Sequence, residues 1–254
     1  MSNLERFQNV VLGGGEAGKY IAWELARWGQ RVAVVEKRLI GGSCPNIACL
    51  PSKNVIHSAK IVEVVRHAST FGLRLGPWTV DMAGVRQRKR ELVDGMIAIH
   101  KARFAADGLE FILGDGRFLG PKTIEVRLAQ GGTRRREGER VFLNLSTHAA
   151  IPDIRGLSGA APLTHVEVLE LDRIPTHLIV LGGYVGLEMA EAFRRFGSRV
   201  SGTPHTGKRH DNIKARFSNR NRSSAARRLF ADLGEAPAKR NKRSGRPAHC
   251  ARNW

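Results

Sequence analysis

Residues 9–36 read NVVLGGGEAGKYIAWELARWGQRVAVVE, and this stretch decides the fold. A short apolar run, Asn9–Leu12, ends in glycines, which is typical of a buried parallel strand. Apolar residues at helical spacing follow over Ala17–Trp28, and Gly29 ends that pattern. A second apolar run covers Arg31–Glu36. The order strand, helix, strand within about thirty residues predicts a right-handed βαβ unit.

The turn between this first strand and its helix carries the pattern G-x-G-x-x-G. Its small residues are Gly13, Gly14, Gly15, Ala17 and Gly18. The amino end of the helix offers free N–H groups and positive potential to a pyrophosphate. Glu36 ends the next strand, where an acid can accept hydrogen bonds from a ribose diol. We therefore expect a dinucleotide site here, and the alternative is a glycine-rich turn of another α/β protein.

Farther along, the patterns predict two helices, three short strands and a second strand–turn–helix unit. The expected ranges are 48–67 and 82–106 for the helices, 110–113, 123–128 and 140–145 for the strands, and 177–181 and 185–196 for the second unit. Gly131-Gly132 is a hairpin turn between the last two short strands. A further strand begins at Arg199-Val200 and is expected to stop at Ser201.

Positive charge is concentrated at the carboxyl end of the chain. Residues 201–254 carry 14 Lys and Arg against 3 Asp and Glu, of 42 and 23 in the whole chain, whose net charge is +19. This tail shows neither helical nor strand periodicity, so we expect it to be irregular or disordered. A basic tail can bind nucleic-acid phosphates, but this one has few aromatic residues and no recognised motif, so we do not expect that role. Its abrupt onset within a strand suggests out-of-frame translation instead.

Three cysteines, Cys44, Cys49 and Cys250, are too few for a secreted disulfide framework. The amino end has no apolar segment of a signal peptide, and no stretch reaches the length of a membrane span. We therefore expect a cytoplasmic protein without membrane contact. In a reducing compartment, a close cysteine pair is typical of catalysis or metal binding.

The close pair lies in the segment Gly41–Lys53, which reads GGSCPNIACLPSK. On a regular helix, residues five apart have Cα atoms roughly 8–9 Å apart, whereas a disulfide needs less than about 7 Å. Pro45 and Pro51 make an irregular turn plausible, and a helix amino end is expected to lower the thiol pKa. The alternatives are a zinc site, for which His57 is the nearest further ligand, and a buried structural pair.

This segment resembles the active-site motif of the class I pyridine nucleotide–disulfide oxidoreductases, GG-[ST]-C-x-N-x-[GA]-C-x-PSK, at every fixed position. The family includes dihydrolipoamide dehydrogenase, glutathione reductase and mercuric reductase. Residues 114–118, GDGRF, resemble the family's adenine-side turn, and 179–191 resemble the opening of its NAD(P) domain. The resemblance covers roughly residues 7–200 and none of the tail.

The resemblance implies an α/β fold. A Rossmann-like FAD-binding domain with a small β-meander (1–150) would be followed by the start of a second Rossmann-like, NAD(P)-binding domain (151–200) and a basic irregular tail (201–254). It also implies that NAD(P)H reduces the flavin and the flavin reduces the disulfide Cys44–Cys49, with Cys49 beside the flavin and Cys44 attacking the substrate. A disulfide, a dihydrolipoamide-type compound or Hg(II) would be that substrate. Further cofactor-binding positions are Gly42, Ser43, Lys53, Gly116, Gly182, Gly183, Tyr184, Gly186 and Glu188.

The sequence departs from the family pattern in three ways. Leu181 falls where the second turn has its first glycine, so either a residue is missing or a side chain occupies the tightest position. Ser146 replaces a usual glycine. We expect the chain to lack the domain that forms the family's homodimer and supplies its His–Glu pair, and we expect His57 and the other histidines to be ordinary surface or packing residues. The alternative function is therefore an inactive, truncated nucleotide-binding fragment.

Overall fold

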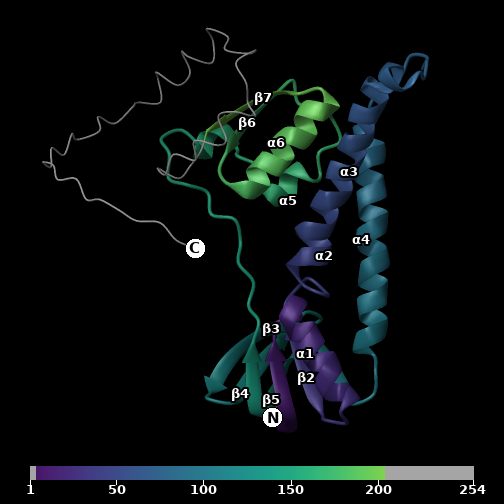
Figure 1. Cartoon of the computed structure of the whole chain (residues 1–254). Coiled ribbons are helices and arrows are strands. Elements are labelled where there is room, and N and C mark those ends of the chain that lie inside the picture. The colour runs from purple at the N-terminus through teal and green to yellow at the C-terminus, as the bar shows by residue number, and fades with distance from the viewer. Residues whose placement is uncertain (1–3, 204–254) are drawn as a thin grey trace, which may run out of the picture. The chain divides into compact units, whose positions relative to one another are not determined.

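The computed structural model describes residues 4–203, and Figure 1 shows their helices and strands. The expectations for residues 204–254 lie outside the described residues. The elements in chain order are β1 Leu4–Leu12, α1 Glu16–Arg27, β2 Val32–Glu36, α2 Ser43–Ile47, α3 Cys49–Arg66, the 3-10 turn η1 Ala68–Phe71, α4 Met82–Phe104, β3 Leu109–Gly120, β4 Thr123–Leu128, β5 Thr133–Leu143, the 3-10 turn η2 Ser158–Ala160, α5 His165–Val168, β6 His177–Leu181, α6 Tyr184–Phe196 and β7 Arg199–Thr203.

The first five strands close into a barrel in the order β1-β2-β3-β4-β5. β1 lies between β2 and β5 and is parallel to both, with Leu12 opposite Val35 on one side and Leu143 on the other. β2 pairs parallel to β3, and β3, β4 and β5 form an antiparallel meander. Because parallel strands share an orientation, the carboxyl ends of β1, β2 and β5 meet at one edge. The predicted βαβ unit and β-meander are confirmed.

Alternate residues of β1 face two different apolar layers. Val10 and Leu12 point into the barrel and pack with Val35, Ile124 and other strand residues. Val11 points to the opposite face and packs against α1 and α4 through Leu25 and Phe104. Both faces are therefore buried, which explains why the sequence shows a continuous apolar run instead of an alternating one.

The second sheet is small. β6 and β7 pair in parallel from His177 opposite Arg199 to Leu181 opposite Thr203. The predicted end of the last strand at Ser201 is therefore wrong, because Ser201–Thr203 continue the ladder. α6 buries Met189 and Phe193 in a core that it shares with Val55 of α3 and Met82 of α4. Figure 1 shows α3 and α4 running side by side.

Within residues 4–203, no helix is both long enough and apolar enough to cross a membrane.

Candidate active site

The glycine loop after β1 is a tight turn whose shape requires glycine. Gly13 has φ +104° and donates its N–H to the carbonyl of Val35 at 2.8 Å. A Cβ on Gly13 would lie 2.1 Å from the carbonyl oxygen of Asn144, and one on Gly18 would lie 2.1 Å from that of Gly13. Gly15 precedes α1 and provides no side-chain cap. The first turn of α1 is therefore held close to β1, as the fingerprint requires.

Glu36 lies beside this loop at the end of β2, as the sequence predicts. Its Oε2 accepts a hydrogen bond from the N–H of Gly14 at 2.8 Å. Its Oε1 accepts from the N–H groups of Arg38 at 2.9 Å and Leu39 at 3.0 Å. The carboxylate thus orders the turn after β2, and its binding of a ribose stays a prediction.

Asn144 is part of this site, although the sequence pattern places it only within the expected strand 140–145. It follows β5, and its N–H donates to the carbonyl of Leu12 at 2.8 Å. With its side-chain oxygen turned toward α1, it accepts from the N–H groups of Gly15 at 3.2 Å and Gly18 at 3.1 Å. Its place at the carboxyl end of a strand parallel to β1 is the signal that could have identified it.

The segment with the cysteine pair lies against the glycine loop. Gly42 has φ +86°, and a Cβ placed on it would be 2.4 Å from the Cα of Gly15. The hydroxyls of Ser43 and Ser146 are 2.6 Å apart, so Ser146, where the family has glycine, makes a contact with the redox segment. The side chain of Asn46 donates to the carbonyl of Gly42 at 2.7 Å.

A break between α2 and α3 separates the two cysteines. Ala48 has φ −129° and ψ −101°, which is outside the helical region. The break follows from Pro51, because a proline ring clashes with the carbonyl four residues earlier, here that of Ile47. Both cysteines are free thiols, Cys49 is exposed, and Cys44 is partly buried. The distorted turn that the sequence requires for bridging is therefore present.

The pKa of Cys44 moves in the opposite direction to the one expected from a helix amino end. Burial raises it to about 11, and a side-chain hydrogen bond with Cys49 adds to the rise. Glu16 raises it further, whereas Lys19 lowers it. α2 has only five residues, so its end cannot outweigh burial.

Lys53 and Glu188, two predicted site residues far apart in the sequence, are brought together. The Nζ of Lys53 on α3 lies 2.6 Å from both carboxylate oxygens of Glu188 on α6. The pair borders a hollow of about 250 Å³ between the two helices. With side chains that are 59% and 39% exposed, this is a surface ion pair between α3 and the second strand–turn–helix unit.

The second glycine turn differs from the first. Leu181 ends β6 as Leu12 ends β1, and Gly182 has φ +133° as Gly13 has φ +104°. Gly183 precedes α6 as Gly15 precedes α1, so this turn is one residue shorter than the first, which is the missing-residue alternative of the sequence pattern. A Cβ on Gly186 would meet the side chain of Val180 at 2.9 Å, so this glycine allows helix and strand to pack. Tyr184 is 82% exposed.

The expected turn at residues 114–118 is wrong, because these residues belong to β3 and pair with β4. A Cβ on Gly116 would lie 2.6 Å from the side chain of Leu12 and 3.1 Å from that of Val35. The glycine therefore allows the strand to pack over the barrel interior. A cofactor contact of Gly116 stays a prediction.

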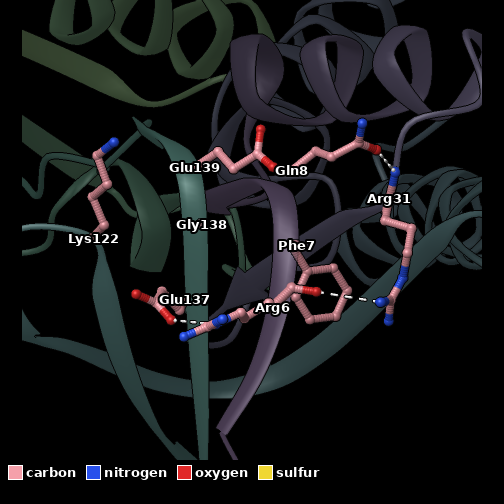
Figure 2. A pocket seen from close by; sticks show the side chains of 8 residues that line it. All are labelled: Arg6, Phe7, Gln8, Arg31, Lys122, Glu137, Gly138 and Glu139. Atoms are coloured by element: carbon pink, nitrogen blue, oxygen red, sulfur yellow. Dashed lines mark hydrogen bonds and ion pairs between the residues drawn. The ribbon is translucent and has the colours of Figure 1, made fainter.

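A separate hollow of about 510 Å³ lies at the amino ends of β1 and β2. Figure 2 shows three of its charged side chains in contact with nearby groups: Arg6 binds Glu137 at 3.0 Å, and Arg31 donates to the carbonyl of Arg6 at 3.3 Å. Ligands of parallel sheets bind at the carboxyl ends of the strands. This hollow is therefore at the opposite end from the glycine loop and is not part of the candidate site.

The comparison with known proteins agrees with this geometry. The family model described as pyridine nucleotide-disulphide oxidoreductase matches residues 7–222. The chain belongs to this family. The match continues past residue 200, where the motif comparison ended the resemblance. Proteins of this family are oxidoreductases that use FAD and NAD(P)H.

Two curated relatives show how much of such an enzyme the chain spans. Dihydrolipoamide dehydrogenase of Chaetomium thermophilum is 30% identical over 197 residues, which are 76% of this chain and 39% of the relative. Mercuric reductase of Streptomyces lividans is 34% identical over 196 residues, 76% of this chain and 41% of the relative. The chain thus spans about two fifths of the length of these family members.

Among solved structures, the chain is similar to the HOCl-induced flavoprotein disulfide reductase of Escherichia coli in its Cu(II) complex. The TM-score is 0.69 at 27% identity, and the match covers 91% of this chain and 48% of the other. The α/β fold of this oxidoreductase family is therefore confirmed for the described residues.

Proposed function

We propose that this chain is a flavin-dependent oxidoreductase whose Cys44–Cys49 pair exchanges electrons with a small disulfide, a dihydrolipoamide-type compound or Hg(II). The observation that supports it best is the contact of Gly42 with Gly15, where an added Cβ would be 2.4 Å from the neighbouring Cα. This contact sets the redox segment directly on the dinucleotide loop. FAD, when bound, supplies electron transfer between a nicotinamide and the cysteine pair.

The residues present fit FAD. Gly15 provides no side-chain cap to α1, so the N–H of Ala17 can face a pyrophosphate, between the N–H groups of Gly15 and Gly18 that donate to Asn144. Gly13, Gly15 and Gly18 have no side chains, so a ligand can approach the backbone of the glycine loop closely. The Glu36 carboxylate lies next to this loop. We assign the main phosphate contact to the N–H of Ala17, because the N–H groups of Gly14 and Gly15 donate to Glu36 and Asn144, and we assign the ribose contact to Glu36.

The cysteines provide the chemistry at the substrate. With the pair reduced, the Cys44 thiolate attacks one sulfur of a substrate disulfide and forms a mixed disulfide, and the other substrate sulfur leaves as a thiolate that takes a proton. Cys49 then attacks the sulfur of Cys44, which releases the second substrate thiol and leaves the Cys44–Cys49 disulfide. The substrate gains two electrons, and the pair loses two. The break at Ala48 permits the pairing.

Lys53, Glu188, Tyr184 and the glycines at 182, 183 and 186 form the proposed nicotinamide side. The ion pair between Lys53 and Glu188 joins α3, which carries Cys49, to the helix after the second glycine turn. We also infer a reducing, cytoplasmic compartment. The turn between β6 and α6, which is one residue shorter than the turn between β1 and α1, favours a second candidate, a chain that binds FAD but not NAD(P)H.

Flavin binding is the direct test. Purified protein is expected to show a visible flavin absorption band, and Gly15→Ala is expected to lose it without losing its circular dichroism. Gly15 has φ −73°, which alanine adopts freely, and its Cβ would meet only the movable side-chain end of Asn144 within 3 Å. Gly76→Ala, where nothing lies within 4 Å, is the control.

A colourless protein that stays colourless after FAD is added would contradict the proposal. Titration with NADH and NADPH then separates the two candidates. Bleaching of the flavin band by either nucleotide supports the oxidoreductase, and bleaching by a dithiol alone supports the FAD-binding protein without nicotinamide turnover.

A further inference from the structure

A lysine is buried directly behind the redox segment. Lys19 follows Gly18 in the first turn of α1, and its side chain is only 3% exposed. Its Nζ lies 2.5 Å from Oε1 of Glu16, 3.3 Å from the carbonyl oxygen of Gly41 and 3.3 Å from Nε2 of His100. An ammonium has three N–H donors, and each of them has an acceptor here. Lysine is seldom buried without such partners, so the charge is held at a defined place.

His100 of α4 is the residue of this cluster that comes from a third segment of the chain. Burial lowers its pKa, and the charge of Lys19 lowers it further, so the imidazole is neutral and its Nε2 accepts from the ammonium. Its Nδ1 then carries the proton and, among the described residues, is buried without a hydrogen-bond partner. A Cβ on Gly41 would lie 2.2 Å from Nδ1, so the ring edge touches the main chain of Gly41. Trp23 stacks on the ring with centroids 5.8 Å apart.

The cluster is attached to the segment that carries the first cysteine. Gly41 precedes Gly42, the residue directly before α2, and Cys44 is the second residue of that helix. The ammonium therefore fixes the chain on the amino-terminal side of the reactive thiol. A buried charge is screened less by water and salt than a surface charge, so its electrostatic interaction with neighbouring groups is stronger.

We propose that Lys19 is a positioning residue for the redox pair: its ammonium, held by Glu16 and His100, anchors the Gly41 carbonyl and stabilises the thiolate of Cys44. The sequence pattern gives Lys19 no role and leaves His100 among the ordinary surface or packing histidines. The inference rests on the proposed function for its purpose, because a stabilised thiolate serves the attack on substrate. The property itself is the ionisation of one thiol and is measured without substrate.

The groups that act directly on this thiol lie on α1 and α3, and α4 acts through Lys19. Cys49 of α3 and Glu16 of α1 oppose ionisation of Cys44, and Lys19 of α1 favours it. From α4, His100 contacts Lys19, and the positive charge of Arg103 helps to keep His100 neutral. Loss of the ammonium alone would leave the Glu16 carboxylate uncompensated beside the thiol.

The test is the pH profile of Cys44 alkylation by iodoacetamide in the reduced full-length protein, with the modified peptide quantified by mass spectrometry. Lys19→Met keeps the unbranched stem and removes the charge. Loss of one nearby charge in a partly buried site shifts a pKa by about one unit, so we expect roughly tenfold slower alkylation at a given pH. Lys101→Met, at an exposed position on α4, is the control and should leave the profile unchanged.

A double variant, Lys19→Met with Glu16→Gln, separates the charge effect from a packing effect. It removes both charges of the pair, so most of the alkylation rate should return. If Lys19 acted only through packing, the alkylation rate would not recover in the double variant, because both hydrogen-bonding side chains are altered. A Lys19→Met profile that superimposes on the wild type, or a double variant that alkylates as slowly as the single one, would overturn the inference.

The flavin band of the same samples keeps the two proposals apart. A protein that lacks flavin but shows the expected alkylation profiles contradicts the proposed function and supports the role of Lys19. A flavin-bearing protein whose alkylation profile is the same with and without Lys19 supports the proposed function and contradicts the role of Lys19.

Discussion

Replacement of Gly42 by alanine tests the contact between the redox segment and the dinucleotide loop. Gly42 has φ +86° and ψ −172°, a backbone region that is almost restricted to glycine and costs other residues about 1–3 kcal/mol. The new Cβ would also lie 2.4 Å from Cα, 3.3 Å from C and 3.4 Å from N of Gly15. All three are backbone atoms, so no side chain can turn away, and overpacking of this kind costs about 1–3 kcal/mol more.

The two costs add to roughly 2–6 kcal/mol, against a typical total stability of about 5–15 kcal/mol. We therefore expect the urea midpoint of Gly42→Ala to fall substantially in equilibrium unfolding followed by circular dichroism. Gly72→Ala is the matched control, because Gly72 has φ +76° but no atom within 4 Å. That variant meets only backbone strain of about 1–2 kcal/mol. Equal midpoints for the two variants would refute the close contact between Gly42 and Gly15.

Two further predictions concern the second sheet and its attachment. Phe193→Ala removes a side chain that is 0% exposed and should destabilise the protein by about 3–5 kcal/mol, whereas Tyr184→Ala at an 82% exposed position should change stability by less than about 0.5 kcal/mol in denaturant unfolding. Burial acts to raise the pKa of Glu170, but hydrogen bonds from Lys89 and Arg90 lower it overall from 4.5. A depressed native pKa adds stability that is present above pH 4.5 and is lost as the pH falls through the native value. Glu170→Gln should therefore flatten the acid side of a plot of melting temperature against pH, and an unchanged slope would contradict the assignment.

The elements that the sequence predicts well are those with local signals. Residues 9–36 combine an apolar run, a glycine turn and a helical repeat, and the structure forms β1, α1 and β2 there. The break between α2 and α3 also has a local cause in Pro51, so an irregular turn at the cysteine pair could be anticipated.

The amino half of β5 could not be found this way. The sequence TRRREGER at 133–140 has no alternation of apolar and polar residues. Arg136 is nonetheless buried, and its guanidinium binds both carboxylate oxygens of Glu110 at 2.7 Å. Arg136 of β5 and Glu110 of β3 are 26 residues apart in the sequence. Their ion pair buries a charged residue where an apolar residue would have indicated a strand. The barrel closes through parallel pairing of β1 with β5, which is a non-local contact without a sequence signal.

The candidate site shows the same division. The glycines, Glu36 and the cysteines stand out by spacing, whereas Asn144, Lys19 and His100 become visible only when three separate segments fold together. The direction of the Cys44 pKa also depends on folding, because burial and the Cys49 thiol are tertiary effects. The position of Cys44 near a helix end therefore does not predict the direction in which its pKa shifts.

The central claim is that the Cys44–Cys49 pair exchanges electrons with NAD(P)H through bound FAD. The most direct measurement counts the reactive thiols of these two residues in oxidised, FAD-loaded protein before and after anaerobic addition of NADH or NADPH, with peptide mass spectrometry to locate them. The account predicts that both cysteines are blocked as a disulfide before addition and that both become reactive after it, but only when FAD is present. Cysteines that are already reactive in the oxidised protein, or that stay blocked after nicotinamide is added to the FAD-loaded chain, would contradict it.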